Sequence, residues 1–299
     1  MTIEFDGKVA IVTGAGSGLG RSHALGLAAR GAAVVVNDLA GASFDNAMRV
    51  VEEIRAGGGT AIADPADVAD FEQVSAMVAR AERLWGHVDI LVNNAGVLRD
   101  KTFAKMEMAD FEFVLRVHLI GSANCTKAVW AGMRERNYGR IVLTSSASGI
   151  YGNFGQANYG AAKAAMIGLM NVLHLEGAKN DIRVNVLAPT ARTGMTEGLL
   201  SPVAAELMTP ESVTPGVLFL VSENAPSRVI LGAGAGVFAV THIGETPGVY
   251  LDESERTPET IAARFAEISD AKTAEPLKDA LSQTMKFVAA AAKAKGIKL

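Results

Sequence analysis

The chain has 299 residues, of which 49% are hydrophobic, 20% charged and 6% aromatic, and these proportions exclude a disordered, collagen-like or low-complexity protein. The 28 basic and 32 acidic residues give a net charge of −4, with no basic stripe that would indicate a nucleic-acid or anionic membrane surface. At roughly 150 residues per domain the length corresponds to about two domains, although single α/β domains also reach it.

The predicted elements alternate between apolar, β-branched runs and longer amphipathic segments up to about residue 240. Strands that are apolar on both faces belong to a parallel sheet with helices on both sides. Residues 1–240 are therefore predicted to form one α/β domain with a single Rossmann-like, doubly wound parallel sheet of about seven strands. In chain order the strands are Val9–Thr13, Ala33–Val36, Thr60–Ala63, Val88–Val92, Arg140–Thr144, Arg183–Leu187 and Gly236–Val240; the helices are Leu19–Arg30, Asp45–Ala56, Phe71–Trp85, Asp110–Arg136 and Tyr159–Lys179.

Residues 241–299 have a different character. A loop rich in glycine and proline leads to Thr257-Pro258, a typical start for the predicted helix Glu259–Ser269, and a second, alanine-rich helix covers Pro276–Lys295. Neither helix can bury its apolar face alone. We interpret this part as a helical C-terminal extension that packs on the core or on a partner subunit, rather than as a second domain.

Cysteine content and the N-terminal sequence bear on location. A single cysteine, Cys125, cannot form an intrachain disulfide, and it is interpreted as a small buried hydrophobe. The first residues lack the basic and apolar regions of a signal peptide, and no apolar run reaches the length of a membrane span. We expect a cytoplasmic protein without nucleic-acid or membrane partners.

The first strand is followed by a glycine-rich turn that leads directly into a helix. Such a turn lets the backbone approach a pyrophosphate, which the N–H groups and the dipole of the helix N-terminus stabilise. A lone glycine motif also serves plain strand–helix packing, but its place after the first strand favours dinucleotide binding. The candidate residues are Thr13, Gly14, Ser17, Gly18, Leu19 and Gly20.

Asp38 closes the second strand and is the candidate for ribose recognition. A carboxylate there accepts hydrogen bonds from both hydroxyls of an adenine ribose and repels a 2′-phosphate. The neighbouring Ala15 and Leu39 offer no cation for that phosphate, and Arg21 points along the first helix. The sequence therefore favours NAD over NADP as the cofactor; the alternative is a solvated strand end.

Tyr159 and Lys163 are four residues apart in a predicted helix, so they share one face. A nearby ammonium stabilises a phenolate, which suits the pair to proton transfer at a substrate oxygen. Ser146 follows the strand Arg140–Thr144, where its hydroxyl can polarise a carbonyl at the ligand-binding edge of the sheet. Taken alone, a Tyr-x-x-x-Lys pair is common on protein surfaces.

Together, the glycine pattern, the run Asn93-Asn94-Ala95-Gly96, Ser146 and Tyr159-x-x-x-Lys163 resemble the short-chain dehydrogenase/reductases. The resemblance implies that Tyr159 is the acid/base, that Lys163 holds the nicotinamide ribose and lowers the tyrosine pKa, and that Ser146 orients the substrate oxygen. It also implies cofactor contacts around the sheet edge; their candidates are Asp67, Val68, Asn94, Ala95, Gly96, Pro189, Ala191 and Thr193. The usual Pro-Gly pair of the family is Pro189-Thr190 here.

His118 occupies a position where family members usually have an asparagine that completes a catalytic tetrad. A lone helical histidine is more often packed or solvated. An imidazole can also donate and accept as an amide does, or shuttle protons. Both interpretations stay open, and His118 is a candidate catalytic residue. No metal site is expected.

A narrower resemblance extends over nearly the whole chain. The segments Asn93–Asp100, Val117–Ser122 and Tyr138–Tyr159 are similar to the (3R)-hydroxyacyl-CoA dehydrogenase domain of the peroxisomal multifunctional enzymes of type 2, also called 17β-hydroxysteroid dehydrogenase type 4. That subgroup also has histidine at the asparagine position, and a similar C-terminal extension. The resemblance implies oxidation of a (3R)-hydroxyacyl-CoA to the 3-oxoacyl thioester, in fatty acid metabolism.

Other readings stay open at this stage. A hydroxysteroid or other bulky alcohol is an alternative substrate, because fold does not determine substrate. Arg99, Lys101 and Arg192 are candidates for binding the CoA phosphates, or ordinary surface charges. A silent nucleotide-binding scaffold is a remote alternative, because the tyrosine and lysine are both present. A homodimer or homotetramer is expected through Asp110–Arg136 and Tyr159–Lys179, as is usual in the family.

Overall fold

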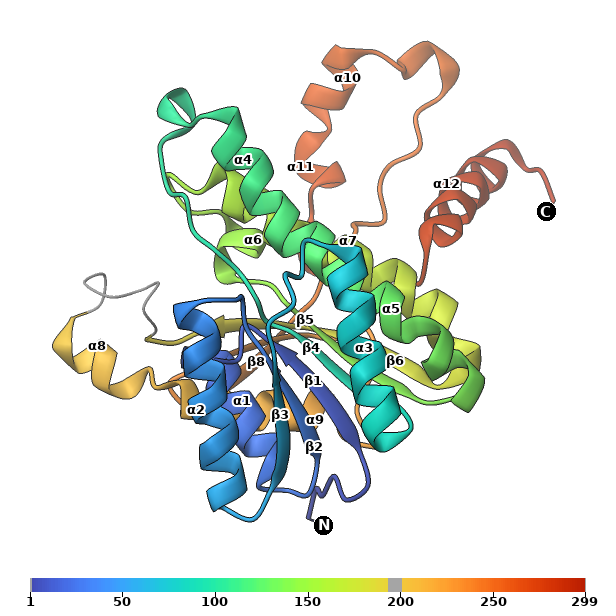
Figure 1. Cartoon of the computed structure of the whole chain (residues 1–299). Helices are drawn as coiled ribbons and strands as arrows, with labels where there is room; N and C mark the ends of the chain where they lie inside the picture. The colour runs from blue at the N-terminus through green and yellow to red at the C-terminus, as the bar shows by residue number, and fades with distance from the viewer. Residues whose placement is uncertain (1, 193–200, 299) are drawn as a thin grey trace. The chain divides into compact units, whose positions relative to one another are not determined.

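The structure is a computed structural model that describes residues 2–192 and 201–298. One eight-stranded sheet forms its centre, in the order β3-β2-β1-β4-β5-β6-β7-β8 (Figure 1). The pairs from β3 to β7 are all parallel, which confirms the predicted doubly wound α/β fold. The strands are β1 Val9–Thr13, β2 Ala33–Asn37, β3 Thr60–Asp64, β4 Ile90–Asn93, β5 Gly139–Thr144, β6 Ile182–Thr190, β7 Ile230–Gly234 and β8 Val237–Thr241.

The last part of the sheet differs from the prediction. The seventh parallel strand is β7, whereas the predicted strand Gly236–Val240 coincides with the additional strand β8. Ala235 (φ 50°) and Gly236 (φ 76°) join the two strands, and positive φ at both positions is typical of a type I′ hairpin. A connection this short reverses the chain, so β8 runs antiparallel to β7. The prediction missed β7 because the glycines at 232 and 234 interrupt its apolar pattern.

Helices cover both faces of the sheet. Buried side chains of α1, α2 and α9 pack against one face, and those of α3, α5 and α7 pack against the other. Because successive strand residues point to opposite faces, Val12 of β1 belongs to the first cluster and Ile11 to the second. These helices are α1 Gly18–Ala28, α2 Ala42–Ala56, α9 Thr214–Leu220, α3 Phe71–Trp85, α5 Gly121–Arg136 and α7 Ala157–Gly177.

α3 begins and ends where its sequence dictates, and its predicted bounds are confirmed. The carboxylate of Asp70 accepts hydrogen bonds from the backbone N–H groups of Glu72 and Gln73, which stabilises the first turn. At the other end Gly86 adopts φ 87°, a left-handed conformation that glycine takes without steric cost and that ends the helix.

The predicted helix Asp110–Arg136 consists of three consecutive segments. α4, Met108–Leu115, is followed by a π-helical turn, η2, Arg116–Ile120, and then by α5. A π turn carries one extra residue relative to an α-helix, and such turns occur frequently at functional sites. His118 lies in this turn. Periodicity alone did not predict the interruption, nor the short helices α6 Ala147–Tyr151 and α8 Pro202–Leu207.

The chain divides into two compact units, Met1–Val240 and Thr241–Leu299. In the second unit α10, Pro258–Ala263, starts as predicted after Thr257, whose hydroxyl accepts from the N–H of Thr260. α11, Phe265–Ile268, follows, and α12, Ala280–Lys295, begins later than predicted because Asp279 caps it. Lys286 pairs with Glu245 at 2.6 Å inside this unit. Its role as an extension that packs on the core or on a partner stays a prediction.

His23 of α1 should make the fold sensitive to acid. It is fully buried, its Nδ1 lies 2.9 Å from the Thr214 hydroxyl, and burial lowers its pKa to about 3. Since the unfolded histidine titrates near 6.5, the unfolded chain binds more protons below that pH, and the free energy of unfolding falls as the pH drops from 6.5 toward 3. Both proteins should lose free energy of unfolding between pH 6.5 and pH 4. In His23→Leu we expect this loss to be smaller than in the wild type by roughly 1–3 kcal/mol. Urea unfolding at the two pH values measures this, and equal losses in both proteins would contradict it.

Candidate active site

The predicted site residues gather at the carboxyl edge of the parallel sheet. β1 lies between β2 and β4, so the chain proceeds to opposite sides of the sheet on leaving these strands. In open α/β sheets, ligands bind in the crevice formed at such a switch point. Thr13 ends β1, Asn93 ends β4 and Thr144 ends β5, and the candidate Ser146 follows two residues after Thr144.

Thr13 and Asn94 tie the ends of β1 and β4 together. The Thr13 hydroxyl accepts hydrogen bonds from the backbone N–H groups of Asn94 and Ala95, both at 3.0 Å. The Asn94 amide donates in return to the carbonyls of Thr13, at 2.9 Å, and Gly14, at 3.0 Å. Asn94 thus fixes the glycine turn from behind, and both of its amide hydrogens are used for this purpose.

The glycine turn delivers an open helix N-terminus to this edge. Gly14 has φ 61° and Gly18 has φ 53°, conformations that favour glycine. A Cβ on Gly20 would lie 2.2 Å from the Gly14 carbonyl and 2.5 Å from the Asn94 amide, so only glycine allows this close packing. Ser17, the N-cap residue, makes no side-chain cap, and the first turn of α1 carries no acidic residue. These features fit the pyrophosphate of a dinucleotide.

Asp38 stands next to this turn at the end of β2. Its Oδ2 accepts from the N–H of Gly16 at 2.8 Å, and its Oδ1 accepts from the N–H of Leu39. A carboxylate has further lone pairs that can accept from ribose hydroxyls. Arg21 forms a bidentate pair with Glu53, with both Nη2–Oε distances 2.7 Å, so its charge is engaged away from a ribose phosphate.

Ser146, Tyr159 and Lys163 come together at the ends of β5 and α7. Ser146 caps α6 by accepting from the N–H of Ser148 at 3.2 Å, and its hydroxyl forms a hydrogen bond with Tyr159. Lys163 is buried, and its ammonium donates to the Thr144 carbonyl at 2.6 Å. The Lys163 nitrogen lies 5.5 Å from the centre of the Tyr159 ring. The hydroxyl pair can hold a substrate oxygen, with a cation close by.

The electrostatics of this cluster differ from what the family resemblance implies. Burial raises the pKa of Tyr159; the hydrogen bond from Ser146 lowers it, and the charge of Asp100 raises it further. Burial also lowers the pKa of Lys163 to about 7. An ammonium with this pKa is only partly charged at neutral pH, which weakens its stabilisation of a phenolate. In the structure, burial of the phenol therefore outweighs the expected lowering by lysine.

His118 is buried within the site and faces Tyr159. The two rings make an edge contact at 5.3 Å with an interplanar angle of 84°. Its Nε2 lies 2.8 Å from the carbonyl oxygen and 3.1 Å from the amide nitrogen of Val97. Burial, followed by the charge of Lys163, lowers its pKa to about 3. The imidazole is neutral at pH 7, and it connects the π turn to the segment behind β4. Nδ1 has no partner among the described residues.

Sequence reasoning missed several polar residues that hold the segment around Tyr159. Asn158 is fully buried; its amide donates to the Arg99 carbonyl at 2.9 Å, and its side-chain oxygen accepts from the N–H of Tyr159. Gln156 donates to Asp100 at 2.7 Å. The only signal in the sequence was their place directly in front of Tyr159, because Gln156 precedes α7 and makes no side-chain cap.

The other candidates lie at various points of the same edge or outside it. Asp67 accepts from the N–H of Ala69, and Val68 is buried where a Cβ on Gly121 would touch it. Pro189 is at the end of β6, Ala191 is buried behind it, and Gly96 passes so close to His118 that a Cβ would clash with the imidazole. Thr193 lies outside the described residues. The contacts of this set with a cofactor stay predictions.

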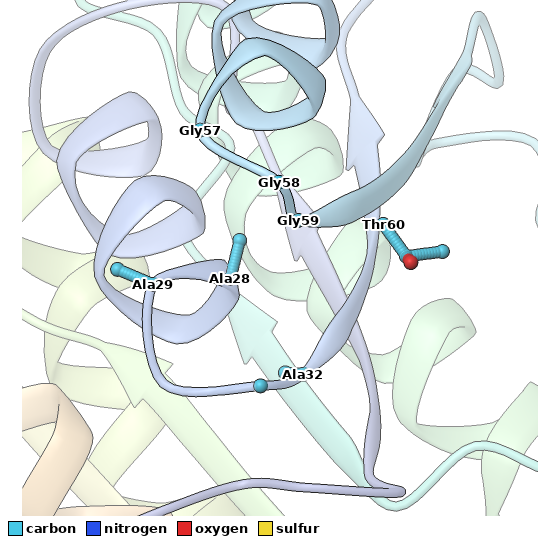
Figure 2. A pocket seen from close by; sticks show the side chains of 8 residues that line it. Ala28, Ala29, Ala32, Gly57, Gly58, Gly59 and Thr60 are labelled. Carbon is cyan, nitrogen blue, oxygen red and sulfur yellow. The ribbon is translucent and has the colours of Figure 1, made fainter.

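Other features of the described residues lie outside the candidate site. A shallow hollow lies at the amino ends of β2 and β3, lined by small residues such as Ala32 and Gly58, and offers almost no side-chain chemistry (Figure 2). The thiol of Cys125 is buried, and burial raises its pKa to about 12. Over residues 2–192 and 201–298, no cluster of His, Cys, Asp and Glu could hold a metal ion, and no helix could span a membrane.

The fold and the site define a dinucleotide-binding α/β protein with a Ser-Tyr-Lys cluster. A family model described as short chain dehydrogenase matches residues 8–202. The chain belongs to this family, which confirms the resemblance seen in the sequence.

Individual relatives give further comparisons. The chain is 45% identical over 275 residues to "Peroxisomal multifunctional enzyme A" of Dictyostelium discoideum, covering 90% of this chain and 61% of that protein. The structure of full-length peroxisomal multifunctional enzyme type 2 from Drosophila melanogaster matches with a TM-score of 0.82 and 37% identity, over 97% of this chain and 50% of that one. A 7α-hydroxysteroid dehydrogenase complexed with NADH and 7-oxo glycochenodeoxycholic acid matches with a TM-score of 0.72 and 32% identity, over 78% and 95% of the two chains. The chain thus spans between about a third and three fifths of the length of the multifunctional enzymes that it matches.

Gly20→Ala tests the glycine turn. The added methyl group would overlap the Gly14 carbonyl, so the turn must open. We expect the dinucleotide to bind at least about tenfold more weakly, and the free energy of unfolding to fall by roughly 1–3 kcal/mol. Gly57→Ala, at the residue that follows α2, is the matched control, because its φ is −79° and an added Cβ would come no closer than 3.4 Å to its neighbours; it should leave binding unchanged. Dinucleotide titration by calorimetry measures both, and unaltered affinity in Gly20→Ala would refute the assignment.

Proposed function

We propose that this protein is an NAD-dependent oxidoreductase that converts a secondary alcohol to a ketone. The observation that carries the proposal is the hydrogen-bonded pair of Ser146 and Tyr159, with Lys163 buried beside it, at the switch point of a dinucleotide-binding sheet. Family membership supports the nicotinamide cofactor. A catalytically silent scaffold is disfavoured because each catalytic role has a residue in place.

The chemistry follows from the site geometry. Held at the glycine turn and Asp38, NAD would supply the acceptor for the hydride of the carbinol carbon. Ser146 and Tyr159 hold the substrate oxygen between their hydroxyls, and Tyr159, in its phenolate form, takes the proton from that oxygen. Lys163 stabilises the phenolate once the cofactor ribose hydroxyls are within its reach, a contact that the family resemblance implies. His118 holds the segment behind β4 through Val97. Its imidazole carries no positive charge at pH 7, because burial lowers its pKa.

The favoured substrate is a (3R)-hydroxyacyl-CoA, oxidised to the 3-oxoacyl thioester. Support comes from the similarity to peroxisomal multifunctional enzymes over most of this chain. The charges suggested for CoA are less free than expected. Arg99 and Lys101 lie 3.9 and 3.2 Å from the carboxylate of Asp110, whereas Arg192 has an exposed side chain. A hydroxysteroid is the second candidate, supported by the similarity to a hydroxysteroid dehydrogenase.

Location and assembly are part of the proposal. From the sequence we expect a cytoplasmic protein that forms homodimers or homotetramers. The names of the multifunctional relatives, in contrast, refer to the peroxisome. Localisation by microscopy of the tagged full chain and sedimentation of the purified protein address these two points.

Tyr159→Phe tests the catalytic assignment. Removal of the phenol oxygen should lower kcat by about a thousandfold or more, because no other described group can take the proton at that position, while the affinity for NAD changes little. Steady-state NADH production with (3R)- and (3S)-hydroxyacyl-CoAs of graded chain length and with hydroxysteroids measures kcat/KM for each class. Turnover retained by the variant would refute the role of Tyr159, and a preference for steroids would refute the acyl-CoA assignment.

Asp38→Ala tests the preference for NAD. Loss of the ribose acceptor should reduce kcat/KM for NAD by about tenfold to a hundredfold, since a hydrogen bond to a charged group contributes about 1.5–3 kcal/mol. Adding Leu39→Arg to this variant should raise activity with NADP, because the carboxylate that repels the 2′-phosphate is gone and a cation stands at the next position. If NADP is already used as well as NAD by the wild type, the ribose role of Asp38 is wrong.

A further inference from the structure

The segment that follows β4 is attached residue by residue to the segment that precedes Tyr159. The backbone carbonyl of Arg99 accepts a hydrogen bond from the Asn158 amide at 2.9 Å. The Asp100 carboxylate accepts from the Gln156 amide at 2.7 Å. The backbone N–H of Lys101 donates to the Gly155 carbonyl at 2.9 Å. Lys101 and Gln156 also form an isolated parallel bridge. Three consecutive residues therefore hold the start of α7, which carries the tyrosine.

Gln156 extends this attachment to the catalytic serine. Its Oε1 accepts from the Ser148 hydroxyl at 2.8 Å and from the Asn153 amide at 3.0 Å. A carboxylate only accepts hydrogen bonds, so Asp100 fixes which end of the Gln156 amide faces it. The N–H of Ser148 donates to Ser146, and Ser146 bonds to Tyr159. Exposed Asp100 is thus connected with the Tyr159 hydroxyl by a chain of hydrogen bonds in which Ser148 is the covalent link, because its hydroxyl bonds to Gln156 and its backbone N–H bonds to Ser146.

We propose that Asp100 and Gln156 are positioning residues of the reaction: they hold Ser146 and Tyr159 in register and place one negative charge where it opposes formation of the phenolate. The proposal deepens the proposed function and rests on it for its kinetic consequences. Neither residue is placed to touch the reacting atoms. The arrangement gives Asp100 a role in setting the pH at which the enzyme works, in addition to its role in geometry.

Electrostatics supports this assignment. Among the described residues, His118 from the π turn and Lys163 from α7 lie against the Tyr159 ring, and the charge of Asp100, from the segment after β4, acts on its pKa. His118 is neutral at pH 7, and burial weakens the charge of Lys163. Asp100 is the group whose charge raises the pKa of Tyr159, and its side chain is exposed.

Asp100→Asn separates charge from geometry. The new amide oxygen can still accept from Gln156, but the charge is gone, so Tyr159 should titrate at lower pH and the rising limb of kcat/KM against pH should move in the same direction. Glu112→Gln is the matched control, because it removes one exposed carboxylate from α4 that takes part in no ion pair among the described residues. It should leave both curves in place.

Gln156→Ala breaks the chain of hydrogen bonds. We expect kcat to fall about tenfold or more while KM for NAD stays within twofold, because the reacting hydroxyls lose alignment and the dinucleotide cradle is untouched. Ser148→Ala, which keeps the Asp100–Gln156 bond, should produce a smaller loss of the same kind. It serves as the second variant if circular dichroism shows that Gln156→Ala is unfolded.

The titration of Tyr159 needs no substrate, so it distinguishes failure of this inference from failure of the proposed function. The phenolate absorbance is recorded after pH jumps faster than alkaline unfolding, and the Tyr159→Phe spectrum is subtracted to remove the other three of the four tyrosines. A Tyr159 curve that is the same in Asp100→Asn, Glu112→Gln and the wild type overturns the charge assignment. Wild-type kcat in both Gln156→Ala and Ser148→Ala overturns the positioning role. If the wild type oxidises no alcohol, the proposed function fails, while the titration still decides the role of Asp100.

Discussion

The closure of β1 onto β4 by Thr13 and Asn94 is the constraint on which the site depends. One hydroxyl and one amide satisfy four backbone groups at the point where two strands separate, groups that would otherwise be partly buried without partners. Because this closure holds the glycine turn against the end of β4, the N-terminus of α1 and the segment 95–101 have fixed positions relative to each other. The first has the open N–H groups that suit a pyrophosphate, and the second holds the start of α7, which carries Tyr159, so both parts of the candidate site depend on this one closure.

The parallel core was predictable because its signals are local and redundant. β1 and α3 have the bounds that their apolar runs, an N-terminal Asp and a C-terminal Gly indicate. The order of motifs then gave the candidate site, and the structure brings Ser146, Tyr159 and Lys163 together. β7 was missed because its two glycines interrupt the apolar pattern, although the strand pairs with β6 and its other side chains, such as Leu231, are buried in the core.

Other features could not be read from the chain because they depend on contacts over long separations. The hydrogen bonds of Asn158 and Gln156 reach residues 59 and 56 positions away, and nothing in the local pattern identifies those partners. The direction of the Tyr159 pKa is also a tertiary property: the residue pair suggests a lowered value, whereas burial among α7, the π turn and the segment behind β4 raises it. Burial was the quantity that the sequence did not provide.

The π turn at Arg116–Ile120 has a consequence for how this part of the chain can change. Each residue in a helix advances the chain by about 100° around its axis, so the extra residue sets the rotational phase of α5 relative to α4. Deleting one residue from this turn would rotate the whole of α5 and withdraw its buried face, which includes Val129 and Met133, from the core. The length of this segment is therefore constrained as strictly as its composition: substitutions at exposed Arg116 or Ile120 are tolerable, whereas a change in residue number is not.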